Sequence, residues 1–111
     1  MNQSSHLTQG LAARQERHAR TATKSAILYT LYTEDRDNLL TLVSRYFAGA
    51  TLINAVGLYN GQTELAKVIE ILGTLDDMQS VVHLAGDIKE VNNQQSVLMI
   101  YAPVNSLSVG V

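Results

Sequence analysis

Hydrophobic and polar positions alternate with two different periods along the chain, and each switch of period marks a predicted element. A period of two is typical of β-strands, whereas apolar residues at i, i+3, i+4 and i+7 indicate one face of a helix. The pattern predicts the order βαββαβ, with strands at 25–33, 50–59, 64–72 and 95–102 and helices at 35–48 and 74–86. This order predicts a ferredoxin-like α+β fold, in which both helices cover one face of a four-stranded antiparallel sheet.

Local signals set the expected boundaries of these elements. The Asn-Gly pair at 60–61 predicts a hairpin turn, because both residues tolerate positive φ. Thr74, followed three residues later by Asp77, predicts the start of the second helix. Gly86 is expected to end that helix, and Pro103 is expected to end the last strand because proline has no N–H for the ladder.

Each predicted helix carries its apolar residues on one face, which is the face expected to pack on the sheet. These residues are Leu39, Leu42, Val43, Tyr46 and Phe47 in the first helix and Leu75, Met78, Val82 and Ala85 in the second. Gly49 suits the exit from the first helix. His83 falls on the other side of the second helix and is expected to be exposed.

The predicted strands are apolar on both faces, and the two helices alone cannot bury both faces of the sheet. The strand at 64–72 shows this pattern, with Leu65, Ile69 and Ile71 on one face and Ala66, Val68 and Leu72 on the other. Helices on one side bury only one sheet face, so the second face is expected to be covered by another copy of the chain. The alternative is that the N-terminal arm or the C-terminal tail folds over it.

Length and charge divide the chain into an arm, one domain and a tail. The 111 residues suffice for one domain, predicted at 24–103, with a polar and flexible arm at 1–23 and a tail at 104–111. Residues 1–24 hold four basic side chains against one acidic one, whereas the remainder holds four basic and nine acidic ones. The body is therefore not expected to bind nucleic acid, and the arm lacks the interleaved aromatics of single-strand binders.

Composition also limits the chemistry and the compartment. The chain has no cysteine, which excludes disulfides and thiolate sites, and His6, His18 and His83 lack the spacing of metal ligands. No cofactor or metal is expected. No apolar stretch approaches the roughly 20 residues that a membrane span needs. Because the N-terminus is polar and lacks a secretory signal, the expected location is the cytoplasm.

Two residues stand out as candidates for a functional site. Glu70 is a carboxylate inside an otherwise apolar strand, where burial without a partner would be costly. An edge position that reaches solvent, or an ion pair with an arginine, would explain it structurally. Tyr59 ends the second strand beside the predicted turn, where it is either a packed aromatic or a group that contacts a ligand.

The parity of the hairpin places these two residues on one face of the sheet. If Tyr59 pairs with Glu64, then Glu70 pairs with Ile53, and if the turn has two residues, Glu70 pairs with Thr51. Both registers put Tyr59 and Glu70 on the same face. At about 3.4 Å per residue they lie roughly 20 Å or more apart, so a site that uses both must take them from two different chains.

The stretch Gly57-Leu58-Tyr59-Asn60-Gly61-Gln62-Thr63-Glu64, together with Glu70, resembles the small phage-encoded S-adenosylmethionine-degrading enzymes. These enzymes were long called hydrolases and are better described as lyases. In that family a Gly-x-Tyr ends one strand and a glutamate follows eleven residues after the tyrosine, as Tyr59 and Glu70 do here. The family is similar in fold to the PII signalling proteins, which are trimers of ferredoxin-like subunits with sites between neighbours. The resemblance covers roughly residues 25–102.

The resemblance implies a homotrimer that binds S-adenosylmethionine between subunits in the cytoplasm, the host's cytoplasm if the chain is phage-encoded. The carboxylate of the substrate would attack its own γ-carbon, releasing 5′-methylthioadenosine and leaving homoserine lactone. No cofactor and no protein nucleophile are required. Glu70 would hold the cationic end of the substrate and Tyr59 would orient it, by its hydroxyl or its ring face, while Glu64 and Val68 would line the pocket.

Other functions fit parts of the same pattern. A PII-like regulator would bind an adenine nucleotide between subunits, although such proteins carry a long loop where only about four residues are expected here. A copper-tolerance-type trimer has the same topology, but this chain lacks cysteine and clustered histidine. A structural or inhibitory phage protein would use the basic arm on a host partner.

Overall fold

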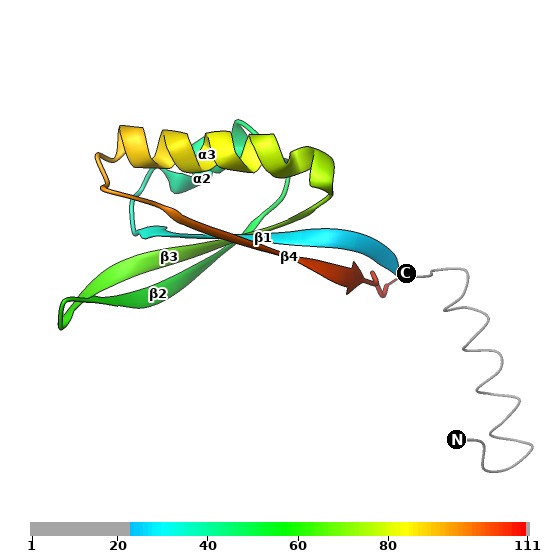
Figure 1. Ribbon diagram of the computed structural model, residues 1–111, viewed down its shortest axis with the longest axis horizontal. Helices are drawn as coiled ribbons and strands as arrows, with labels where there is room; N and C mark the ends of the chain where they lie inside the picture. Colours follow the sequence, from blue (N-terminus) through cyan, green and yellow to red (C-terminus); the bar gives the residue numbers. More distant parts are fainter. Residues whose placement is uncertain (1–22, 111) are drawn as a thin grey trace, which may run out of the picture. The chain divides into compact units, whose positions relative to one another are not determined.

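The chain forms four strands and two α-helices in the predicted order (Figure 1). The computed structural model describes residues 23–110, of which Ala26–Val104 make one compact unit. In chain order the elements are β1 (Lys24–Glu34), α2 (Leu39–Ser44), β2 (Thr51–Tyr59), β3 (Gln62–Gly73), a 3-10 turn η1 (Leu75–Asp77), α3 (Met78–Val91) and β4 (Leu98–Ser106). The predicted arm at 1–23, with His6 and His18, lies outside the described residues except for its last position.

The sheet has the strand order β2-β3-β1-β4, so β1 and β3 lie at its centre and β2 and β4 form its edges. β3 pairs antiparallel with β2 on one side and with β1 on the other. α2 and α3 lie together on one side of this sheet (Figure 1). The predicted ferredoxin-like α+β fold is confirmed.

The core lies between the helices and one face of the sheet. The strands contribute Tyr29 and Leu31 from β1 and Ile69 and Ile71 from β3, all at most 1% exposed. The helices contribute the remaining buried apolar residues, which are Leu39, Leu42 and Val43 in α2 and Val81, Leu84 and Ile88 in α3. At about 1.5–3 kcal/mol for each fully buried large side chain, this layer is the main source of the stability of the fold.

The hairpin β2–β3 has a tighter turn than the expected four-residue connection. β2 ends at Tyr59 and β3 begins at Gln62, so only Asn60 and Gly61 connect them. Their φ angles of 49° and 75° are both positive, as a two-residue turn that matches the twist of the strands requires. The Asn-Gly signal was therefore right, and the connection is two residues shorter than predicted.

The first helix is much shorter than the predicted segment 35–48. β1 continues to Glu34, and the N–H of the next residue, Asp35, still donates to the carbonyl of Leu65 at 3.2 Å. α2 then runs only from Leu39 to Ser44, although the N–H of Phe47 still reaches the carbonyl of Val43 at 3.0 Å. The apolar period extends beyond the helix because the flanking residues pack on the same core.

The second helix is longer than predicted, and its buried face overlaps the predicted one only in part. The prediction that Gly86 ends it was wrong, since α3 continues to Val91 and thereby buries Ile88. Of the predicted face, Met78 and Ala85 pack on the core, but Leu75 and Val82 are 68% and 45% exposed. Leu75 lies in the 3-10 turn, whose shorter period shifts the phase of the stripe. The start was predicted correctly, with the Thr74 N–H donating to Asp77 Oδ2 at 2.8 Å.

An exposed glycine inside a helix predicts a stabilising substitution. We expect Gly86→Ala to raise the free energy of unfolding by about 1 kcal/mol, because alanine loses less backbone entropy in a helix. A Cβ at this position would have no heavy atom within 4 Å, so no clash opposes the gain. Thermal unfolding monitored by circular dichroism would measure it, and an unchanged or lower Tm would contradict the prediction.

The last strand begins and ends later than the predicted 95–102. β4 runs from Leu98 to Ser106 and includes Pro103. β4 is an edge strand, where a residue without an N–H is tolerated, so Pro103 does not end it. Gln94 is buried among polar partners, and the segment that follows it reaches the sheet only at Leu98.

Candidate functional site

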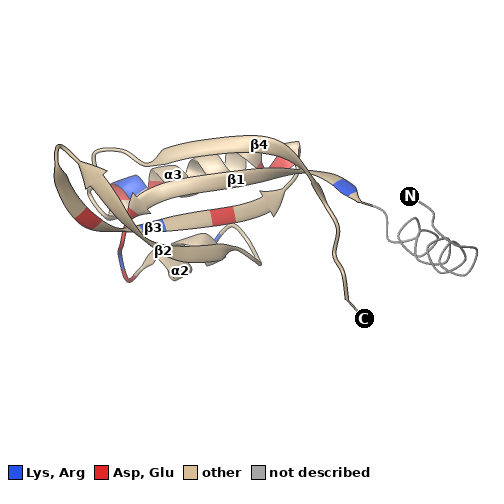
Figure 2. Cartoon of the chain, turned by 90° about the horizontal axis from the view of Figure 1, so that it is seen from below, with Lys and Arg blue, Asp and Glu red and all other residues tan. Residues whose placement is uncertain are grey.

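Residues 23–110 leave the sheet face opposite the helices exposed, and this face is mostly apolar. It carries five large apolar side chains that are 41–60% exposed, namely Tyr32, Ile53, Leu72, Leu98 and Ile100. Figure 2 views the chain from this side and shows long stretches of the four strands without charged residues. This open face is the second apolar face that the strand pattern predicts.

Tyr59 and Glu70 both belong to the open face, as the parity of the hairpin predicts. Glu70 pairs with Thr51 and Gln62 pairs with Tyr59, so odd positions of β2 and even positions of β3 share this side. Tyr59 and Thr51, the partner of Glu70, are eight residues apart along β2, which is a distance of about 27 Å. One chain therefore does not bring Tyr59 and Glu70 together, whereas Glu64 and Val68 lie with Tyr59.

A hollow surrounds Tyr59 at the hairpin end of the open face. It has a volume of about 510 Å³, within the usual range of about 300–1,000 Å³ for ligand pockets. It forms because Ala55, Gly57 and Ala66 lie in neighbouring rows of β2 and β3 and leave space between larger side chains. We call it the Tyr59 hollow, and its lining includes Tyr32, Glu34, Ala55, Gly57, Tyr59, Glu64, Ala66, Val68 and Gln94.

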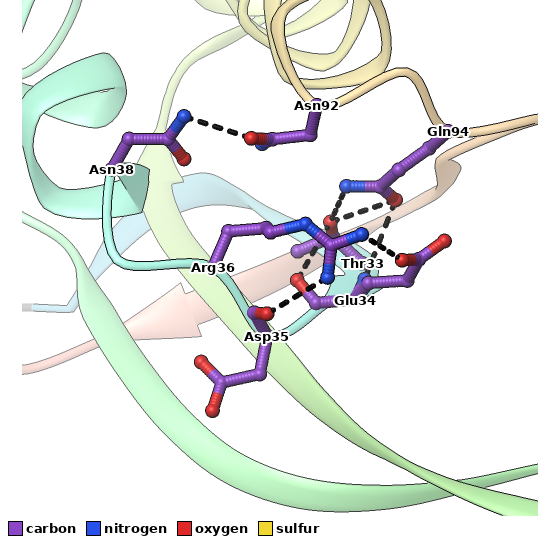
Figure 3. Close-up of polar contacts among 7 residues, drawn as sticks. All are labelled: Thr33, Glu34, Asp35, Arg36, Asn38, Asn92 and Gln94. Carbon is purple, nitrogen blue, oxygen red and sulfur yellow. Dashed lines mark hydrogen bonds and ion pairs between the residues drawn. The ribbon is translucent and has the colours of Figure 1, made fainter.

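A buried polar network fixes the β1 side of the Tyr59 hollow (Figure 3). The side chain of Gln94 is 5% exposed, and its Nε2 donates to Thr33 Oγ1 at 2.8 Å. Its Oε1 accepts the backbone N–H of Glu34 at 3.3 Å. Arg36 forms an ion pair with the carboxylate of Glu34. Close by, Asn38 Nδ2 donates to Asn92 Oδ1 at 2.8 Å and joins the start of α2 to the end of α3.

A second hollow surrounds Glu70 at the other end of the open face. It has a volume of about 550 Å³, and we call it the Glu70 hollow; it is lined by Leu28, Phe47, Ala48, Gly49, Ala50, Thr51, Glu70 and Leu72. Glu70 is half-buried and is the one ionisable residue in this lining. β3 is an internal strand, so the explanation of Glu70 as an edge residue was wrong.

Within residues 23–110, no hydrogen bond or ion pair reaches the Glu70 carboxylate. A carboxylate in a hollow of otherwise uncharged residues, mostly apolar, lacks the counter-charge that would compensate its partial loss of water. It attracts a cation more strongly there than at an open surface, because less solvent screens the charge. The Glu70 hollow is therefore suited to the cationic part of a ligand.

Two tyrosines with raised pKa values stabilise the fold. Burial, with the nearby charges of Asp77 and Asp76, raises the pKa of Tyr29, whose hydroxyl donates to the carbonyl of Thr74. A hydrogen bond to Asp87 raises the pKa of Tyr46 and ties the segment after α2 to α3. Both groups keep their protons at neutral pH and serve the fold.

Sequence reasoning missed several residues of the Tyr59 hollow, among them Tyr32, Glu34 and Gln94. Tyr32 pairs with Val68 across β1 and β3, and Glu34 pairs with Ala66. The signal was available in principle, since the ferredoxin-like order places the first strand beside the third. Gln94 gave no signal, because its burial depends on contacts between segments 60 residues apart.

Residues 23–110 contain neither a cluster of metal-ligating side chains nor a helix that could cross a membrane. Between residues 23 and 110, no group of three or more His, Asp or Glu side chains could hold a metal ion. His83 is exposed on α3, as predicted. No described helix combines the length and the apolar character that a membrane crossing requires.

The chain is similar in fold to a solved structure of a DUF3240 family protein from Shewanella baltica. The two align with a TM-score of 0.61 at 12% identity, covering 78% of this chain and 97% of the other. No protein-family model and no curated protein matches the chain. At this identity the likeness extends to the fold alone and supports the ferredoxin-like α+β architecture.

Proposed function

We propose that this chain cleaves S-adenosylmethionine to 5′-methylthioadenosine and homoserine lactone. The observation that carries the proposal is the half-buried Glu70 carboxylate, alone among uncharged groups and without a counter-charge in residues 23–110. S-adenosylmethionine brings a sulfonium and an ammonium, which together supply that counter-charge. The resemblance of Gly57-x-Tyr59 and Glu70 to the phage-encoded lyases points to the same substrate.

The proposed site lies between two copies of the chain. Tyr59 and Glu70 share the open face but lie about 27 Å apart, so one small substrate contacts both only if they come from neighbouring subunits. A second copy also covers the apolar residues of this face that residues 23–110 leave exposed. We propose a homotrimer, in keeping with the resemblance to PII-like assemblies.

The reaction requires little from the protein beyond binding and orientation. An oxygen of the substrate carboxylate attacks the γ-carbon, and the C–S bond breaks with its electron pair passing to sulfur. The products are a neutral thioether and a lactone whose ammonium is unchanged, so no water, proton or protein nucleophile is consumed. Because one positive and one negative charge disappear, a water-poor site that folds the substrate into attack geometry accelerates the step.

Each of the four candidate residues then has a defined role. Glu70 holds the cationic end of the substrate, and Tyr59 orients it through its hydroxyl or the face of its ring. Glu64 and Val68 line the pocket on the Tyr59 side. No resident metal or cofactor is needed, and because the substrate is a common metabolite of the cytoplasm, we place the reaction there.

Product analysis tests this function directly. Purified protein is incubated with S-adenosylmethionine in metal-free buffer, and early samples are separated by chromatography with mass detection. Methylthioadenosine together with homoserine lactone, before any homoserine, is the expected result. If homoserine appears first, the reaction is a hydrolysis and not a lactonisation. No turnover by folded and assembled protein would contradict the enzyme and favour a non-catalytic PII-like binder of adenine nucleotides.

A further inference from the structure

We infer that the Tyr59 hollow is a nucleoside subsite that takes an uncharged purine nucleoside and rejects its phosphorylated forms. The inference rests on the proposed function, which supplies the identity of the base. Its physical basis is separate and consists of the shape of the hollow, its aromatic and amide groups, and the sign of its charges. The substrate would then span two hollows, with its nucleoside here and its cationic end at the neighbour's Glu70 hollow.

The floor of the Tyr59 hollow is made of small residues. Ala55 and Ala66 form a cross-strand pair, and Gly57 faces Glu64 in the next row. Methyl groups and bare backbone at three adjacent positions leave a surface on which a planar ring can lie. The sheet face elsewhere carries larger side chains, such as Ile53 and Leu72, that would lift a ring away from the backbone.

The walls of the hollow supply what a purine base requires. Tyr32 and Tyr59 line it with two aromatic rings, which are 42% and 66% exposed and therefore accessible to a ligand. Stacking of a base on an aromatic side chain typically contributes about 1–3 kcal/mol. Gln95 and Ser96 are exposed along the same border and offer an amide and a hydroxyl group for the hydrogen-bonding edge of a base.

The charges of the hollow oppose a phosphate. Two acidic residues, Glu34 and Glu64, line the hollow. The described lining contains neither lysine nor arginine. The nearby cation Arg36 is already paired with Glu34. The other hollow adds a third carboxylate, Glu70. A nucleotide would therefore bring like charges together on this face, whereas a nucleoside brings none.

Calorimetry tests the subsite without any turnover. It measures how tightly the assembled protein binds 5′-methylthioadenosine, adenosine and AMP. We expect methylthioadenosine and adenosine to bind at least about tenfold more tightly than AMP. This ratio of affinities should decrease in Glu64→Lys, because the variant replaces a negative charge of the hollow with a positive one. Tyr32→Ala should weaken methylthioadenosine about tenfold through loss of stacking. Equal or tighter binding of AMP to the unaltered protein would overturn the inference.

Gly57→Val tests the location of the subsite. A Cβ at Gly57 would meet Glu64 and Ala66 atoms at 3.6–3.9 Å, which are ordinary contacts, so the strand accommodates valine while its side chain fills the hollow. We expect methylthioadenosine affinity to fall at least about tenfold, and Thr63→Val, on the other face of the same hairpin, to leave it unchanged. Unchanged affinity in both Gly57→Val and Tyr32→Ala would overturn the assignment.

The two proposals fail in different ways. If the unaltered protein binds the nucleoside, Gly57→Val removes this binding, and S-adenosylmethionine is not cleaved, the subsite is supported and the proposed enzymatic activity is contradicted. If Gly57→Val and Tyr32→Ala both cleave S-adenosylmethionine with an unchanged KM, the enzymatic activity is supported and the subsite is contradicted.

Discussion

Glu70→Gln is expected to lower kcat for S-adenosylmethionine cleavage by about 100-fold or more while the protein stays folded and assembled. Glutamine keeps the size of the side chain and its ability to form hydrogen bonds but removes the charge. Since Glu70 is half-buried among uncharged groups, its attraction to the cationic substrate is weakly screened. Removing one such preorganised electrostatic contact typically costs about 10²–10³ in kcat.

The measurement compares kcat and KM of the variant with those of the unaltered protein at matched concentrations of assembled protein. Glu90→Gln is the matched control, because its side chain is 79% exposed on α3 and belongs to neither hollow. It should retain full turnover. An assembled Glu70→Gln protein with unchanged kcat and KM would remove Glu70 from the mechanism.

Ile53→Lys is expected to dissociate the assembly and abolish turnover without altering either hollow. Ile53 is 41% exposed in the middle of the open face, between Thr51, which lines the Glu70 hollow, and Ala55, which lines the Tyr59 hollow. A lysine there would be buried without a partner when a second copy docks. Central interface positions typically contribute about 2 kcal/mol or more, which is about 30-fold in Kd.

Sedimentation and activity measured over the same concentration range would show whether assembly and turnover are lost together. Val82→Lys provides the control, because Val82 is similarly exposed, at 45%, but lies on α3 on the helix side of the sheet. It should affect neither property. An Ile53→Lys protein that sediments as a monomer and still cleaves the substrate would contradict a site shared between chains.

The fold was predictable because its signals are local. The alternation in β1 and β3 and the Asn60-Gly61 turn are read from adjacent residues, and together they determine the register of the hairpin. The errors arose where burial in the folded chain outweighs a local signal. Gly86 does not end α3, because a longer helix buries Ile88, and Pro103 does not end β4, because the strand lies at the edge of the sheet.

The candidate site was only partly predictable, since hollows depend on contacts between distant segments. Glu70 and Tyr59 stand out by residue type, and parity alone places them on one face. The grouping of Tyr32 with Val68 requires the strand order, and the position of Gln94 requires the path from α3 to β4. The grouping of Ala55, Gly57 and Ala66 into a floor becomes visible only once the register is known.

Mixing two inactive variants tests the central claim most directly. Tyr59→Ala and Glu70→Gln subunits, each with little activity alone, are unfolded together, refolded and assayed for S-adenosylmethionine cleavage. If each site takes Tyr59 from one chain and Glu70 from its neighbour, random assembly of equal amounts restores about a quarter of the sites. Recovery of that share of turnover is the result we predict. No recovery, in mixed assemblies shown to contain both variants, would contradict a site built between subunits.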